Sequence, residues 1–165
     1  MDLDLMRDGA REFPEVPDPE AVTSARVWHC KYRTLAPLAA LVNLRALSIA
    51  TYPDASLELL ASLEALEELE IMHLPAIRDL DPLSALKGLR RLRLATLPSW
   101  DSSGKVTEVV SLAPIAELPV LEELELFGVV PPDRTVDDLL TSVSLRRVQL
   151  SKYPKRERDR LAHLS

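Results

Sequence analysis

The sequence repeats the hexamer L-x-x-L-x-L, in which x is most often a charged residue. Clear copies are LEELEI at 66–71, LRRLRL at 89–94 and LEELEL at 121–126, and related hexamers occupy 44–49 and 145–150. The central aliphatic residues lie at intervals of 22, 23, 32 and 24 residues and are Leu47, Leu69, Leu92, Leu124 and Val148. Periods of roughly 20–29 residues are typical of stacked repeat units, and the longer interval indicates an insertion of about nine residues.

Each hexamer predicts a short β-strand, because alternate aliphatic residues point to one face of a strand. A second pattern lies between the hexamers: LAPLAAL at 35–41, LDPLSAL at 80–86 and LAPIAEL at 112–118, with a proline-free version, LELLASL, at 57–63. Proline suits the first turn of a helix, so Pro37, Pro82 and Pro114 predict short helices or 3-10 turns, and Asp81 is a candidate N-cap. No such unit can bury its leucines alone, so the units are expected to stack.

The repeats resemble the leucine-rich repeats of roughly 22 residues found in internalins and in leucine-rich phosphatase regulators. The segment IRDLDPLSALKGLRRLRL at 77–94 carries the resemblance most clearly, and the similarity extends over about residues 26–153. It implies an α/β solenoid, a short horseshoe with a parallel sheet on its concave face and short helices or 3-10 turns on its convex face. The family usually has asparagine three residues after the last strand leucine, whereas this sequence has an apolar series there: Tyr52, Leu74, Leu97, Val129 and Tyr153.

We expect a single domain over residues 1–165 with caps at both ends, because terminal repeats of a solenoid need a polar outer face. Residues 1–25 are rich in proline and acidic residues and are predicted to form the N-terminal cap. About six repeats follow over 26–153, and VWHCKY at 27–32 is predicted to supply the first, irregular strand. Residues 154–165 are predicted to form a C-terminal capping helix.

The charged residues of the hexamers change sign from one repeat to the next. Stacking the predicted strands about 4.8 Å apart places Arg91 and Arg93 between the glutamates of both neighbouring strands. We therefore expect the arginines to pair with the protein's own carboxylates, which favours correct repeat order because a misplaced repeat would bring like charges together. The alternative is an anion site at Arg91 and Arg93.

One position further along the strands, two repeats place a large apolar residue on the face that is expected to be solvated. These residues are Met72 and Phe127, with Ala95 between them. The insertion at 98–110 begins just beyond and contains Trp100, a residue type enriched at binding hot spots. Two interpretations remain open: the three side chains form a partner-binding surface, or Trp100 folds over the other two. The candidate partner-binding residues are Met72, Trp100 and Phe127, with a polar rim of Glu70, Arg93 and Glu125.

Several function classes are disfavoured by composition and spacing. The net charge of −6 disfavours nucleic-acid binding. No apolar run approaches the roughly 20 residues of a membrane span, and the acidic N-terminus does not resemble a signal peptide. Adjacent strand residues such as His29 and Cys30 point to opposite faces, so they do not predict a nucleophile–base pair. His73 and His163 lack metal-ligand spacing, and the four glycines form no phosphate loop.

We therefore predict a non-catalytic protein without cofactor, metal or small-molecule substrate, in contact with neither nucleic acid nor membrane. A single cysteine excludes an internal disulfide and favours a reducing, cytoplasmic location. The preference for arginine over lysine, with abundant alanine, leucine and proline, is typical of a high-GC bacterial genome. The predicted function is binding of one protein partner through the concave face and the 98–110 loop, as in an inhibitor or immunity-type protein. The alternative, which the resemblance implies, is a regulatory subunit of an enzyme such as a phosphatase.

Overall fold

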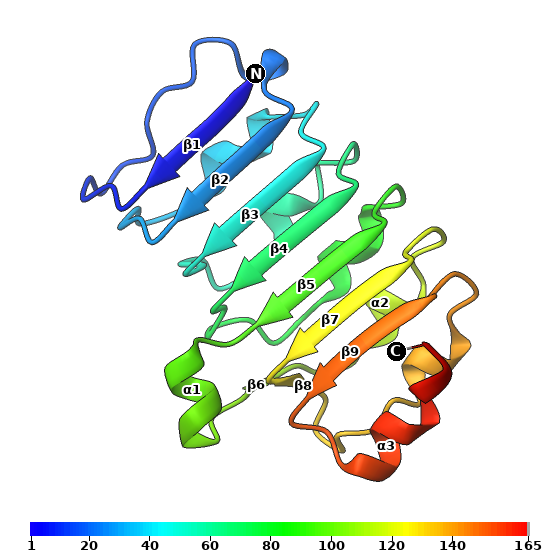
Figure 1. Ribbon diagram of the computed structural model, residues 1–165. Helices are drawn as coiled ribbons and strands as arrows, with labels where there is room; N and C mark the ends of the chain where they lie inside the picture. The colour runs from blue at the N-terminus through cyan, green and yellow to red at the C-terminus, as the bar shows by residue number, and fades with distance from the viewer. Residues whose placement is uncertain (165) are drawn as a thin grey trace.

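The computed structural model describes residues 1–164, and this part of the chain forms a solenoid around one parallel sheet of seven strands (Figure 1). The strand order is β1-β2-β3-β4-β5-β7-β9. Each strand therefore pairs with the strands of the preceding and following repeat units. The strands are β1 Asp2–Met6, β2 Ser24–Trp28, β3 Ala46–Ala50, β4 Glu68–Met72, β5 Arg91–Ala95, β7 Glu123–Phe127 and β9 Arg147–Ser151. The predicted fold class, a leucine-rich repeat solenoid, is confirmed.

The aliphatic residues of each hexamer build the core, as their alternation predicts. Leu69 on β4 pairs in register with Leu47 on β3 and Leu92 on β5, and all three are at most 2% exposed. The same register continues along the sheet, so each leucine packs on the equivalent residue of the next unit. Because the strands are parallel and in register, the residues between the leucines also line up across the opposite, concave face.

The convex side consists of short helices and 3-10 turns behind the sheet (Figure 1). Pro37, Pro82 and Pro114 lie in the first turn of η2, η4 and α2, which confirms the expected helical turns. Asp81 is the first residue of η4 rather than its N-cap, and its own N–H is bound by the Asp79 carboxylate at 2.9 Å. These elements are η1 Pro19–Ala21, η2 Ala36–Ala40, η3 Glu58–Leu60, η4 Asp81–Ala85, α2 Ala113–Ala116 and η5 Asp138–Thr141.

The strand series begins earlier than the sequence analysis predicts. The segment 1–25 contains strand β1, paired in parallel with β2. The expectation that 27–32 supplies the first strand is wrong, because the second strand ends at Trp28. In β2 the two inward positions carry Ala25 and Val27 instead of leucine, so the hexamer pattern does not mark this strand.

The insertion between β5 and β7 is ordered rather than an extended loop. It contains helix α1 (Pro98–Ser103) and the two-residue strand β6 (Thr107–Glu108). Strand β6 pairs in parallel with β8 (Val129–Val130), which follows β7 directly. This second small sheet attaches the far end of the insertion to the next repeat, so α1 projects from the end of β5 (Figure 1).

A left-handed residue follows almost every strand of the main sheet. The φ angles range from 50° to 76° at Arg7, His29, Thr51, His73, Gly128 and Lys152. The exception in the described chain is Thr96 after β5, where the insertion begins. A left-handed residue turns the chain sharply out of the strand, so its absence at Thr96 coincides with the place where the chain leaves the repeat path.

The predicted apolar series in the turns is buried at most of its positions. Tyr52 is 2% exposed and Tyr153 is 5% exposed, while Leu74 and Val129 are fully buried. The two tyrosine hydroxyls donate hydrogen bonds to the carbonyl oxygens of Ser56 and Val129, at 2.7 and 2.8 Å. These tyrosines therefore satisfy backbone groups of the turns, as the family asparagine does, whereas Leu97 at the start of the insertion is only half-buried.

The C-terminal end is covered by helix α3 (Lys155–Arg160) and the 3-10 turn η6 (Ala162–Leu164). Leu161 packs into the core, and the buried Glu157 carboxylate accepts the N–H of Val136 at 3.0 Å and pairs with Arg160 at 2.8 Å. Among the described residues, no helix is long and apolar enough to cross a membrane.

Candidate functional site

Three rows of outward side chains cross the concave face of the sheet, one residue from each strand. The first charged row contains Asp2, Ser24, Ala46, Glu68, Arg91, Glu123 and Arg147. The second charged row contains Asp4, Arg26, Ser48, Glu70, Arg93, Glu125 and Gln149. The apolar row, at the strand ends, contains Met6, Trp28, Ala50, Met72, Ala95, Phe127 and Ser151.

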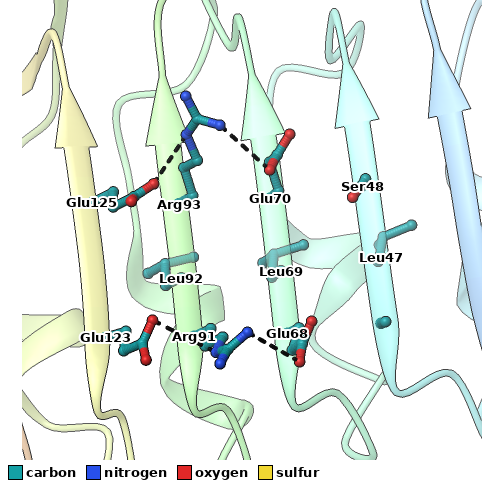
Figure 2. Close-up of a pocket in the computed structure, with 11 residues that line it drawn as sticks. Leu47, Ser48, Glu68, Leu69, Glu70, Arg91, Leu92, Arg93, Glu123 and Glu125 are labelled. Carbon is teal, nitrogen blue, oxygen red and sulfur yellow. Dashed lines mark ion pairs between the residues drawn. The ribbon is translucent and has the colours of Figure 1, made fainter. Parts of the chain in front are cut away.

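Two Glu–Arg–Glu triads occupy the centre of the charged rows (Figure 2). Arg93 pairs with Glu70 at 3.6 Å and with Glu125 at 3.1 Å. Arg91 pairs with Glu68 at 3.8 Å and with Glu123 at 3.6 Å. The arginines therefore meet the protein's own glutamates, as predicted. Both cations are already shared between two carboxylates, which removes the reason to expect an anion site there.

Further ion pairs lie beside the triads. Arg45 binds Glu67 at 2.8 Å, and this hydrogen bond holds the pKa of the Glu67 carboxyl below its ordinary value. At the N-terminal edge, Arg26 forms two hydrogen bonds to the Asp4 carboxylate, at 3.0 and 2.9 Å, which lower the pKa of Asp4. These side chains are 40–62% exposed, so they contribute more to the choice of neighbouring strands than to the free energy of unfolding.

The apolar row is half open to solvent. Met72, Phe127 and Trp28 are half-buried, and Met6 is 46% exposed. Ala50 and Ala95 lie between the larger residues and are almost fully buried, at 1% and 4%. The guanidinium of Arg93 lies 5.4 Å from the centroid of the Phe127 ring, in cation–π range. The rim residue predicted at Arg93 is therefore in direct contact with the apolar row.

Trp100 lies on helix α1 and packs edge-to-face on His73, with ring centroids 5.0 Å apart and an interplanar angle of 81°. The Lys105 Nζ atom lies 5.8 Å from the centroid of the Trp100 ring, and Lys152 pairs with Asp101 at 3.7 Å. The Nδ1 atom of His73 is buried without a hydrogen-bond partner among the described residues, and burial lowers the pKa of this imidazole. Trp100 thus covers the residue after Met72 and remains half-buried itself.

Five of the six candidate residues lie together on the concave face, and the sixth, Trp100, lies beside it on α1. Glu70, Arg93 and Glu125 are consecutive in the second charged row, while Met72 and Phe127 flank Ala95 in the apolar row. Trp100 lies at the border of this surface through its contact with His73, and no ring contact joins Trp100 to Phe127 among the described residues.

Sequence reasoning missed two members of the apolar row. Trp28 and Met6 extend it to the N-terminal edge, because β1 and β2 continue the same register. The signal was present in the alternation of Leu3 and Leu5 and of Ala25 and Val27, but these strands lack the full hexamer. Sequence reasoning also missed a hollow of about 280 Å³ on the charged rows, lined by residues of β3, β4, β5 and β7.

The remaining candidate groups for chemistry follow strand β2. The Cys30 thiol is half-buried and donates to the carbonyl oxygen of Leu5 at 3.4 Å. His29 packs edge-to-face on Trp28 of the apolar row, with ring centroids 5.8 Å apart. Within residues 1–164 there is no group of three or more His, Cys, Asp or Glu side chains that could hold a metal ion.

The parallel strand series, the usual step of 22–24 residues and the stacked leucine core together define a leucine-rich repeat fold. Two similar solved structures are internalins from Listeria monocytogenes. Internalin C2 is 21% identical over 79% of this chain and 62% of its own, with a TM-score of 0.52. Internalin inlF is 18% identical over 99% of this chain and 52% of its own, with a TM-score of 0.59.

This chain thus spans less than two thirds of the length of either internalin. At these identities the similarity establishes the fold and leaves the partner open. No protein-family model and no curated protein matches the sequence.

Proposed function

We propose that this protein is a non-catalytic module that binds one protein partner through its concave face and helix α1 of the 98–110 insertion. The observation that carries the proposal is the apolar row. Large apolar side chains occupy the solvated ends of four strands, whereas the other three strands have Ala50, Ala95 or Ser151 at the same position. Apolar groups that the core does not require, beside rows of charged groups, are typical of a protein interface.

The charged rows have a different role in this proposal. Glu70, Arg93 and Glu125 are already paired, so a partner gains little affinity by contacting them. They fix the orientation of the partner and disfavour wrong partners by like-charge repulsion. The affinity comes from Phe127, Met72, Trp28 and Trp100, because apolar and aromatic anchors dominate most interfaces.

Within this class we propose an inhibitor or immunity-type role in the bacterial cytoplasm, in which the concave face covers the surface of another protein. The support is the net charge of −6, which would attract a basic partner at long range, and the single cysteine, which suits a reducing compartment.

The first experiment is a comparison of three baits in an extract of the source organism. The baits are the wild-type protein, the variant Met72→Asp with Phe127→Asp, and the control variant Val42→Asp. Val42 is 45% exposed and lies outside the sheet, between η2 and β3. A partner of the concave face is retained by the wild type and the control and lost from the double variant. Equal recovery of the same protein by all three baits would refute the proposed surface.

The second experiment separates binding from folding once a partner is known. Phe127→Ala and Trp100→Ala are each expected to weaken binding by about 2 kcal/mol or more, mostly through faster dissociation. The free energy of unfolding should change by less than about 1 kcal/mol, since both side chains are half-exposed. The competing interpretation, in which Trp100 serves only to cover the solenoid, predicts a large loss of stability and an unchanged dissociation constant.

A further inference from the structure

Strand β3 interrupts the charge alternation of the concave face. Its three outward side chains are small: Ala46, Ser48 and Ala50, which we call the β3 strip. Every other inner strand of the sheet carries at least one charged or large apolar residue on this face. In Figure 2 the dashed ion pairs run from β7 through β5 and end at β4, and the next strand presents Ser48. The hollow of about 280 Å³ begins at this strip, with Ala46 and Ser48 in its lining.

The carboxylates beside the strip are incompletely matched. Arg91 and Arg93 each lie between two glutamates, whereas Glu68 and Glu70 each have an arginine on the β5 side only. Each triad contains two carboxylates and one guanidinium, so its net charge is −1. Its glutamate on β4 lies next to the β3 strip. On the other side of the strip, Arg26 is held by two hydrogen bonds to Asp4 and does not pair with Glu70.

The far end of the strip has a different character. Ala50 lies between Trp28 on β2 and Met72 on β4, in the apolar row. Ala50 is only 1% exposed, so an apolar side chain of another chain would rest on the half-buried Trp28 and Met72 that flank it. The strip thus runs from an acidic half at Ala46 and Ser48 to an apolar half at Ala50.

We infer that the β3 strip receives an extended segment of a basic protein partner, with an arginine or lysine side chain between Glu68 and Glu70 and an apolar side chain against Trp28 and Met72 on either side of Ala50. This inference rests on the proposed function and specifies the partner's chemistry. Two features favour a basic partner. Glu68 and Glu70 each pair with an arginine on the β5 side only, and the whole chain has a net charge of −6. Side chains two residues apart in an extended segment lie about 7 Å apart on the same side, which matches the distance between neighbouring rows.

The test uses a defined peptide, acetyl-Leu-Ala-Arg-Ala-Leu-amide, and its analogue with citrulline, a neutral residue of the same shape, in place of arginine. Leucine on both sides of the basic residue allows either chain direction. Amide chemical shifts of ¹⁵N-labelled protein are followed during titration at low salt. The expected result is saturable shifts at Ser48 and Glu70 with a dissociation constant on the order of 1 mM for the arginine peptide. Citrulline is expected to weaken binding by about fivefold or more.

Two variants and one matched control show where the peptide binds. Glu68→Gln with Glu70→Gln should abolish the preference for arginine over citrulline. The matched control, Glu122→Gln with Glu123→Gln, makes the same charge change on the far side of the arginines and should keep the preference. Ala46→Arg supplies a cation from the chain itself beside Glu68 and should abolish peptide binding without lowering the melting temperature.

The inference is overturned if citrulline binds equally well, if the shifts map away from β3 and β4, or if nothing binds at about 10 mM peptide. Argininamide that binds as tightly as the peptide would also overturn it, because the strip would then be a small-cation site. The inference fails alone if the peptide results are negative while Met72→Asp with Phe127→Asp still loses a partner. The proposed function fails if the double aspartate variant keeps every partner that the wild type retains.

Discussion

Reversing the charge of Arg93 tests the ion-pair triads most directly. Its guanidinium lies 3.6 Å from Glu70 and 3.1 Å from Glu125, and the three side chains are 45%, 32% and 36% exposed. A Coulomb energy of about 1 kcal/mol per pair in water falls to a few tenths after side-chain ordering and screening. Arg93→Glu replaces two weak attractions by two similar repulsions and removes the contact with Phe127. The summed effect is a loss of about 1–2 kcal/mol in the free energy of unfolding.

The measurement is urea denaturation at low salt and again in about 1 M NaCl, where the Debye length falls to about 3 Å. Arg93→Gln should lower the free energy of unfolding less than Arg93→Glu does, because it removes the attractions without adding repulsion. The double variant Glu70→Arg with Arg93→Glu should recover part of the loss, since it restores one of the two pairs. Arg33→Glu, an exposed residue without an ion pair among the described residues, is the charge-matched control. An unchanged midpoint for Arg93→Glu at low salt would refute the reasoning.

Other predictions concern single groups. Gly128→Ala should destabilise by about 2 kcal/mol or more, because φ is +76° and a Cβ would lie 2.6 Å from Thr96 Oγ1; Gly104→Ala, with φ +78° and no atom within 4 Å, should cost about half as much in thermal unfolding. Cys30 should react slowly with a thiol reagent at neutral pH, and rapid labelling would contradict its half-buried, hydrogen-bonded state. Because burial lowers the pKa of His73, the unfolded chain binds a proton more readily than the folded chain as the pH falls. The contribution of neutral His73 to the free energy of unfolding is therefore complete above about pH 6.5 and decreases below it. In denaturation curves, His73→Asn should reduce this pH dependence.

The sequence predicts the strands whose hexamers are complete and misses those whose hexamers are not. In β3, β4, β5, β7 and β9 the aliphatic residues fix both the strand and its register, because a shift by one residue would expose the core positions. In β2, Ala25 and Val27 fill the same positions with smaller side chains, and β1 shows only two aliphatic residues of the pattern, Leu3 and Leu5. The β6–β8 pair could not be predicted, because two residues show no period.

The candidate site is predictable to the same extent. The row from Ala50 to Ser151 follows from the register of the complete hexamers, whereas Trp28 lies on β2, which has no complete hexamer to fix its register. The position of Trp100 on α1 depends on a contact with His73, more than 20 residues away in the sequence, for which no local pattern exists. The one-sided pairing of Glu68 and Glu70 follows from the small residues Ala46 and Ser48 on β3, which offer them no partner.

The left-handed turns are positions at which substitution could increase the free energy of unfolding of this solenoid. Non-glycine residues pay roughly 1–2 kcal/mol in that conformation, and five of the turns after main-sheet strands carry one. Thr51 is the least suited of them, because its β-branched side chain tolerates a φ of 71° poorly. Replacing Arg7 or Thr51, whose side chains are exposed, with glycine would relax the backbone without touching the core or the concave face. A binding surface could therefore be redesigned with destabilising changes, and the separate turns at Arg7 and Thr51 could offset the loss independently.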